Sequence, residues 1–122
     1  MTADEITALS ARALSQAIHA RRVSAREVMQ ATLARIATLN PTLNAVVSLR
    51  DTDALLAEAD TLDAELAAGH SRGWMHGMPQ AIKDLAMTAG LTTTMGSPVR
   101  PLVCPPRALV EVVNSESALA LE

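Results

Sequence analysis

The segment Gly77-Met78-Pro79-Gln80-Ala81-Ile82-Lys83-Asp84 organises the rest of the chain. Glycine and proline mark turns more strongly than other residues, so a turn through Gly77 and Pro79 followed by a strand at Gln80–Lys83 is predicted. Lys83 is the only lysine in the chain, since every other cationic side chain is an arginine. A lysine removed from water can lose its proton and act as a base, which an arginine cannot do. Lys83 is therefore the candidate catalytic residue, although a lone lysine at a strand end is more often a hydrated surface charge.

Length and composition set limits on the fold. The chain has 122 residues, of which 49% are apolar, so it holds one domain at most and is not disordered throughout. It has no phenylalanine or tyrosine, and Trp74 is its one tryptophan. Its core must therefore be built from aliphatic side chains and methionine, which bury less area per residue than aromatic rings.

Charge and cysteine content exclude several classes of site. The formal net charge of −3 gives no basic surface for nucleic acid. The single cysteine, Cys104, excludes an internal disulfide framework and a cysteine-rich zinc site. His19, His70 and His76 are too scattered to predict a metal site and are interpreted as surface residues. No phosphate-binding loop is present, so we expect neither a metal nor a cofactor.

The N-terminus carries acidic residues where a signal peptide would carry basic ones, and no long apolar run follows it. We therefore expect neither export nor a membrane span, and predict a cytoplasmic protein.

Two helices are predicted in the first part of the chain. Residues 1–9 are interpreted as a lead-in, and Ser10 caps a helix that runs to about Arg21. Ser24-Ala25-Arg26-Glu27 is a capping box that begins the second helix. Asn40-Pro41 is expected to end it, because proline disfavours helix in the residue before it.

A short strand and a third helix come next. Ala45–Leu49 is rich in β-branched residues and predicts a strand. Asp51 or Thr52 then caps a helix that Gly69 ends. Its apolar residues recur at helical spacing and form a stripe, namely Leu55, Ala59, Leu62 and Leu66. The order of elements predicts an α/β fold, mostly helical, with helices packed on part of a mixed sheet.

The pattern changes after Pro98, because four prolines between 98 and 106 interrupt the chain repeatedly. We therefore divide the chain into residues 1–98 and a poorly organised, proline-rich tail at residues 99–122.

Three segments resemble the amidase signature family. They are Ser24-Ala25-Arg26-Glu27, Leu39-Asn40-Pro41-Thr42-Leu43-Asn44-Ala45, and the Gly77–Asp84 run with Gly90-Leu91-Thr92-Thr93-Thr94-Met95-Gly96-Ser97-Pro98. The similarity extends over roughly residues 7–98, and residues 99–122 do not resemble the family. It implies that residues 1–98 are the N-terminal part of an amidase signature domain.

The resemblance implies a hydrolase that cleaves C–N bonds of small-molecule amides through a Ser–cis-Ser–Lys triad. Lys83 matches the lysine of that triad, which accepts a proton through the bridging serine. The role requires a neutral amine in a buried site. Asp84 would point to the opposite face of the strand and support the backbone instead of pairing with Lys83.

The sequence departs from the family pattern in its serines, which include no Ser-Ser pair and no Gly-Ser-Ser. We therefore expect a chain truncated before the triad serines and inactive alone, with Lys83 hydrated. The strand at Gln80–Lys83 would keep an unpaired edge, and the helices would keep uncovered apolar faces. We expect marginal stability as a monomer, or self-association through these surfaces.

Two other functions stay open. One is a non-catalytic helical fragment that binds a protein partner through the stripe of Leu55, Ala59, Leu62 and Leu66. The other keeps the family but makes the chain part of the amidotransferase subunit that supplies ammonia to glutamyl-tRNA, because that subunit shares the lysine motif.

Overall fold

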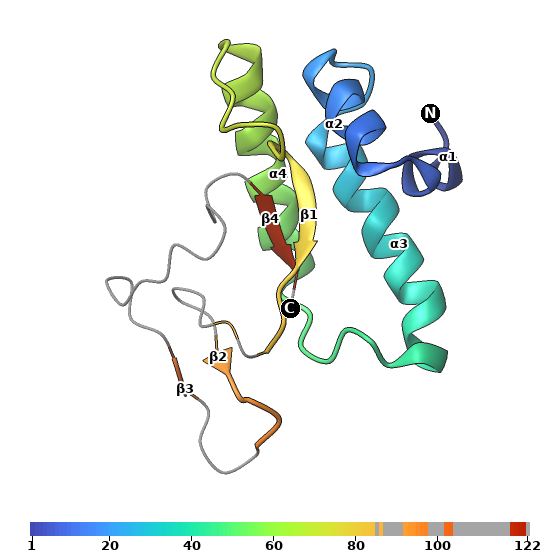
Figure 1. Cartoon of the computed structure of the whole chain (residues 1–122), viewed down its shortest axis with the longest axis vertical. Coiled ribbons are helices and arrows are strands. Elements are labelled where there is room, and N and C mark those ends of the chain that lie inside the picture. Colours follow the sequence, from blue (N-terminus) through green and yellow to red (C-terminus); the bar gives the residue numbers. More distant parts are fainter. Residues whose placement is uncertain (85, 87–91, 98–101, 104–117, 122) are drawn as a thin grey trace.

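The computed structural model describes residues 1–84, 86, 92–97, 102–103 and 118–121, which form four helices and four short strands (Figure 1). The helices are α1 (Ala3–Ala8), α2 (Ala11–His19), α3 (Ala25–Leu43) and α4 (Thr52–Ala67). The strands are β1 (Met78–Ala81), β2 (Thr92–Thr93), β3 (Leu102–Val103) and β4 (Ala118–Leu121). The mostly helical α/β architecture predicted from the sequence is confirmed.

The lead-in at residues 1–9 contains a helix that sequence reasoning missed. Helix α1 begins with a capping box, in which the Thr2 hydroxyl accepts the Glu5 N–H and the Glu5 carboxylate accepts the Thr2 N–H. Ile6 is buried in the core. Six residues are too few for a helix to persist alone, so packing through Ile6 stabilises α1.

The predicted caps of the next two helices are confirmed. The Ser10 hydroxyl accepts the Ala13 N–H at the start of α2, and Ser24 and Glu27 form the capping box of α3. The start of α3 gains a second cap from α4. The Asp63 carboxylate accepts the N–H groups of Ala25 at 2.7 Å and Arg26 at 3.1 Å. These contacts pair N–H groups that a helix start leaves without intrahelical partners.

The expected end of α3 at Asn40-Pro41 is wrong, because the helix runs through Pro41 to Leu43. Proline has no N–H, so Pro41 cannot donate to the carbonyl of residue 37, and the helix ends two residues later at Leu43. Asn44 ends the helix with a φ of 46°, and its N–H donates to the Asn40 carbonyl at 2.7 Å.

The predicted strand at Ala45–Leu49 is also wrong, since residues 45–49 are irregular. The side-chain amide of Asn40 donates to the Val46 carbonyl and accepts the Val46 N–H, both at 2.8 Å. Both backbone groups of Val46 are thereby withdrawn from any strand ladder.

Helix α4 begins and ends as predicted. Asp51 caps it by accepting the Ala54 N–H at 2.9 Å. At the other end Gly69 has a φ of 86°, its N–H donates to the Leu66 carbonyl, and the His70 N–H donates to the Glu65 carbonyl. This is the Schellman arrangement, which favours glycine because of the positive φ.

The apolar stripe of α4 is already covered by this chain. Leu55 and Ala59 are fully buried and Leu62 nearly so, packed against the Ala25 and Met29 face of α3. The hypothesis that the stripe binds a protein partner is therefore wrong for these three residues.

The lysine strand is shifted from its predicted position. Strand β1 spans Met78–Ala81 instead of Gln80–Lys83, so Lys83 lies beyond its end. β1 pairs in parallel with β4, with Met78 opposite Ala118 and Ala81 opposite Leu121. One edge of β1 that we expected to be unpaired is thus covered by residues 118–121. The division of the chain at residue 98 stays a prediction, although β3 and β4 both follow it.

The strands form two separate pairs among the described residues. β1 contacts α3 and β4 contacts α4, so this pair lies beside the helices. The antiparallel pair of β2 and β3 lies apart from the helices (Figure 1). Within the described ranges, no helix combines the length and the apolar character needed to cross a membrane.

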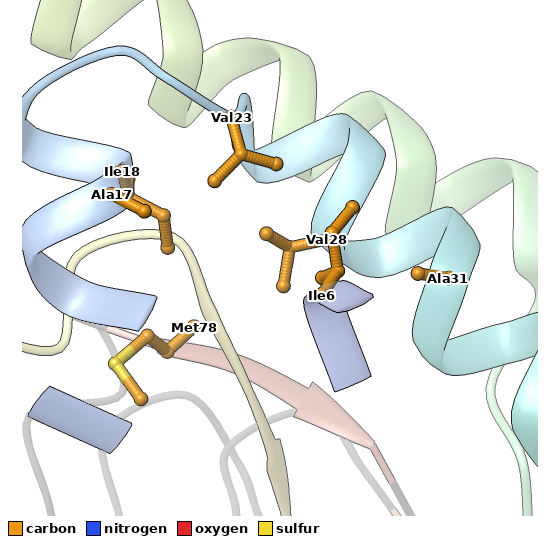
Figure 2. Packing of buried hydrophobic residues seen from close by; sticks show 7 residues of the cluster. All are labelled: Ile6, Ala17, Ile18, Val23, Val28, Ala31 and Met78. Carbon is orange, nitrogen blue, oxygen red and sulfur yellow. The ribbon is translucent and has the colours of Figure 1, made fainter. Parts of the chain in front are cut away.

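Two apolar clusters form the core. The first joins α1, α2, α3 and β1 (Figure 2), and its buried residues are Ile6, Ala17, Ile18, Val23, Val28, Ala31 and Met78. The second lies between α3 and α4, and its buried residues are Ala25, Met29, Leu55, Ala59 and Leu62. Neither contains an aromatic side chain, as the composition predicts.

Gly77 is where these clusters meet the lysine motif. Its φ is 74°, and a Cβ added there would lie 2.8 Å from the Ala25 Cβ, closer than two carbons approach without displacement. Only glycine fits this position without strain.

We predict that Gly77→Ala destabilises the fold more than Gly69→Ala, a matched control with a φ of 86° and nothing within 4 Å of an added Cβ. The control should lose about 1–2 kcal/mol from backbone strain alone. Gly77→Ala should lose about 1–3 kcal/mol more, from overpacking. Urea unfolding of both variants measures the difference, and equal losses would show that the contact with Ala25 is unimportant.

Candidate functional site

Lys83 lies on a surface hollow of about 660 Å³. Its side chain is exposed, and it follows the end of β1. The hollow is bounded by three segments of the chain, and its lining residues are Ala45, Val46, Val47, Ser48, Ala81, Ile82, Lys83, Asp84, Thr94, Gly96 and Ser97. The structure thus brings the lysine motif together with the threonine-rich motif and with the loop after α3.

Asp84 joins the lysine motif to the threonine-rich segment. Its carboxylate accepts the Thr94 N–H at 2.7 Å, the Thr94 hydroxyl at 2.5 Å and the Gly96 N–H at 3.2 Å. The hydrogen bond from the Thr94 hydroxyl, followed by the bond from its N–H, holds the pKa of Asp84 below its usual range. The expectation that Asp84 supports the backbone is confirmed.

The segment that Asp84 holds is a tight turn. The Ser97 N–H donates to the Thr94 carbonyl at 2.9 Å, and Met95 and Gly96 have φ values of 52° and 73°. Positive φ at both central positions is the type I′ arrangement. The carboxylate of Asp84 therefore fixes a turn that forms one wall of the hollow.

A second wall is formed by residues 45–48. The Asn40 amide holds this segment through its two hydrogen bonds to Val46. The side chain of Val47 is 72% exposed. The sequence marked Asn40 only as a helix end and Thr94 only as part of the threonine-rich motif, because residue spacing alone does not specify the contacts that each makes here.

The amine of Lys83 has no hydrogen-bond or salt-bridge partner within the part of the chain that the structure describes. The adjacent carboxylate of Asp84 is engaged by Thr94 and Gly96, so the two neighbouring charges are not paired. Ser48 and Ser97 line the same hollow, and both are exposed.

The interpretation of all three histidines as surface residues is wrong for His76, which is fully buried. A histidine can be buried when both ring nitrogens have hydrogen-bond partners, as they do here. His19 and His70 are exposed. In the described ranges, no group of three or more histidine, cysteine, aspartate or glutamate residues could hold a metal ion.

Comparison with known proteins agrees with this arrangement. The family model described as Amidase matches residues 27–119, beyond residue 98, where the motif resemblance ended. A glutamyl-tRNA(Gln) amidotransferase subunit of Bdellovibrio bacteriovorus is 40% identical over 102 residues, covering 84% of this chain and 20% of that protein. An acylamidase of Rhodococcus erythropolis is 33% identical over 96 residues, covering 79% of this chain and 20% of that protein.

A solved structure shows the same fold. The native peptide amidase of Stenotrophomonas maltophilia matches with a TM-score of 0.79 and 31% identity, over 93% of this chain and 24% of that one. The chain thus spans about a fifth of the length of the amidotransferase subunit and of the acylamidase. With a family match over most of its residues and the lysine motif set at the hollow, this chain belongs to the amidase signature family.

Proposed function

We propose that this chain supplies the lysine-bearing part of a hydrolase of small-molecule amides, with Lys83 as the base of a Ser–cis-Ser–Lys triad. One observation carries the proposal. Lys83 lies on the hollow formed by the family's motifs, while the neighbouring Asp84 carboxylate is engaged by Thr94 and Gly96. A lysine without a compensating carboxylate is easier to deprotonate than one in an ion pair.

The chemistry of Lys83 follows from that role. Its neutral amine would accept the proton of a bridging serine, which in turn would accept the proton of the serine that attacks the amide carbonyl. This transfer requires water to be excluded around the amine, whereas Lys83 is exposed here. We therefore propose that the 122 residues alone do not hydrolyse amides, and that this activity needs serines besides those lining the hollow. We also propose a cytoplasmic location.

A second candidate function is a part in a glutamyl-tRNA amidotransferase. The support is the 40% identity to the amidotransferase subunit of Bdellovibrio bacteriovorus. Such a chain would release ammonia from an amide donor and act beside partner subunits. Lys83 would have the same role in both candidates.

We also propose that the isolated chain self-associates. Its support is a group of exposed apolar side chains on the end of α3 and the loop after it, namely Leu39, Leu43, Val47 and Leu49. Analytical ultracentrifugation across a roughly tenfold range of concentration should show reversible association. A monomer at every concentration that unfolds cooperatively would contradict this proposal.

The catalytic proposal is tested first on the 122-residue chain. A chromogenic anilide should be hydrolysed no faster in the presence of the purified protein, or of its Lys83→Ala variant, than in buffer alone. Turnover that disappears in Lys83→Ala would overturn the proposed inactivity of the chain alone.

A chimera tests the role of the lysine itself. Residues 7–98 of this chain would replace the matching segment of the Rhodococcus erythropolis acylamidase. In an active chimera, Lys83→Ala should lower kcat/KM by about 10²–10⁴-fold, the usual contribution of a general base. Lys83→Arg is the matched control, because it keeps the positive charge but cannot give up its proton. Activity retained with arginine would exclude a base.

We predict that the contact of Asp84 with Thr94 weakens in acid. Because the folded-state pKa of Asp84 is lowered, its stabilising contribution is complete above the ordinary aspartate value of 3.8 and is lost as pH falls through the lower folded-state value. The NMR shift of the Thr94 amide proton should therefore change below about pH 3.8. Asp84→Asn should abolish this change, whereas Asp53→Asn, in the first turn of α4, should preserve it. An unchanged shift down to the onset of global unfolding would contradict the prediction.

A further inference from the structure

His76 is a fully buried histidine with a defined partner at each ring nitrogen. Its Nδ1 accepts the backbone N–H of Arg72 at 3.1 Å, so the ring proton lies on Nε2. Nε2 then donates to the Leu62 carbonyl of α4 at 2.9 Å. One ring therefore joins the middle of α4 to the loop at residues 70–76.

The same loop is held to α2 on its other side. The Ser15 hydroxyl donates to the Trp74 carbonyl. The ring of His19 lies between Ser15 and Ser71, donating from Nδ1 to the Ser15 carbonyl at 2.8 Å and forming a hydrogen bond between Nε2 and the Ser71 hydroxyl at 2.9 Å. The His19 ring centroid lies 6.2 Å from that of His76. The loop is therefore clamped between two helices.

Charged groups complete the surroundings of His76. Arg72 forms an ion pair with Glu65 of α4, with its Nε at 2.7 Å from one carboxylate oxygen. The Arg72 side chain thus binds α4 while its N–H is bound by the His76 ring. Removal of the ring would leave the Arg72 N–H and one acceptor position on the Leu62 carbonyl without these partners.

The loop held by His76 leads directly into β1. Gly77 comes next and approaches the Ala25 Cβ, and β1 begins at Met78. The Met78 N–H donates to the Met75 carbonyl at 3.0 Å, so the strand starts directly from the clamped loop. The position of β1 therefore depends on where the loop is held.

We propose that His76 is a positioning residue, which sets where β1 starts and thereby where Lys83 lies on the hollow. The link to catalysis rests on the proposed function of Lys83, but the effect on β1 does not. Histidine suits this place because its ring presents an acceptor and a donor on different edges. Asparagine can reproduce only the acceptor near Nδ1, and glutamine only the donor near Nε2.

Amide hydrogen exchange of the 122-residue chain tests this role. His76→Ala should speed exchange by about tenfold or more at Met78, whose N–H donates to the Met75 carbonyl, and at the β1 amide that donates to β4, because a buried polar group loses its partner. His76→Asn should keep the Arg72 amide slow, whereas His76→Gln should not. Both variants should restore part of the protection of β1.

The matched control is His70→Ala, an exposed histidine in the same loop, which should leave exchange in β1 unchanged. The ¹⁵N shifts of the His76 ring should report the tautomer protonated at Nε2. If His76→Ala unfolds globally, the exchange of the β1 amides in His76→Asn and His76→Gln, each compared with the wild type, still decides the role, and it should be faster in both variants. Equal protection of β1 in the alanine variant and the wild type, or a proton on Nδ1, would overturn the proposal. If Lys83→Ala left the activity of the acylamidase chimera unchanged, only the proposed function of Lys83 would be overturned.

Discussion

The close approach of Gly77 to Ala25 joins the helical part of this protein to its lysine motif. Ala25 is the first residue of α3, and its N–H is held by Asp63 of α4. The contact therefore brings the start of α3, a carboxylate of α4 and the residue before β1 to one place. Because a Cβ on Gly77 would lie 2.8 Å from that of Ala25, this approach needs a glycine. The position of the lysine strand depends on the helices through this contact.

Lys83 and Asp84 are adjacent in the lysine motif, but their side chains make different contacts. Asp84 uses both carboxylate oxygens on the Thr94–Ser97 turn, and its negative charge is satisfied there by N–H and O–H donors. Lys83 is left without a counter-charge among the described residues. A salt bridge between the two would stabilise the charged amine and oppose the role as a base that we propose for it. The fold prevents this pairing by engaging the carboxylate elsewhere.

Sequence reasoning succeeded where the signal is local. The capping box at Ser24 and the glycine after α4 involve residues within a few positions of each other, so their patterns predict them directly. Sequence reasoning failed where a side chain outside the predicted element takes the place of a backbone partner. The strand predicted at residues 45–49 is absent because Asn40 takes both backbone groups of Val46. The burial of His76 depends on a carbonyl of α4, which no spacing in the sequence reveals.

The same distinction applies to the candidate site. The motif identified Lys83 and the support that Asp84 gives to the backbone, because each follows from the residue type and its neighbours. The exposed side chain of Lys83 agrees with the hydrated lysine expected from the departure of the serines from the family pattern, and it matters for the chemistry. An exposed amine retains its hydration, whereas a base in the proposed triad must exchange that hydration for a serine hydroxyl. Under the proposed function, the part that supplies the serines would therefore also cover the hollow, so water exclusion and catalysis would be achieved by the same contact.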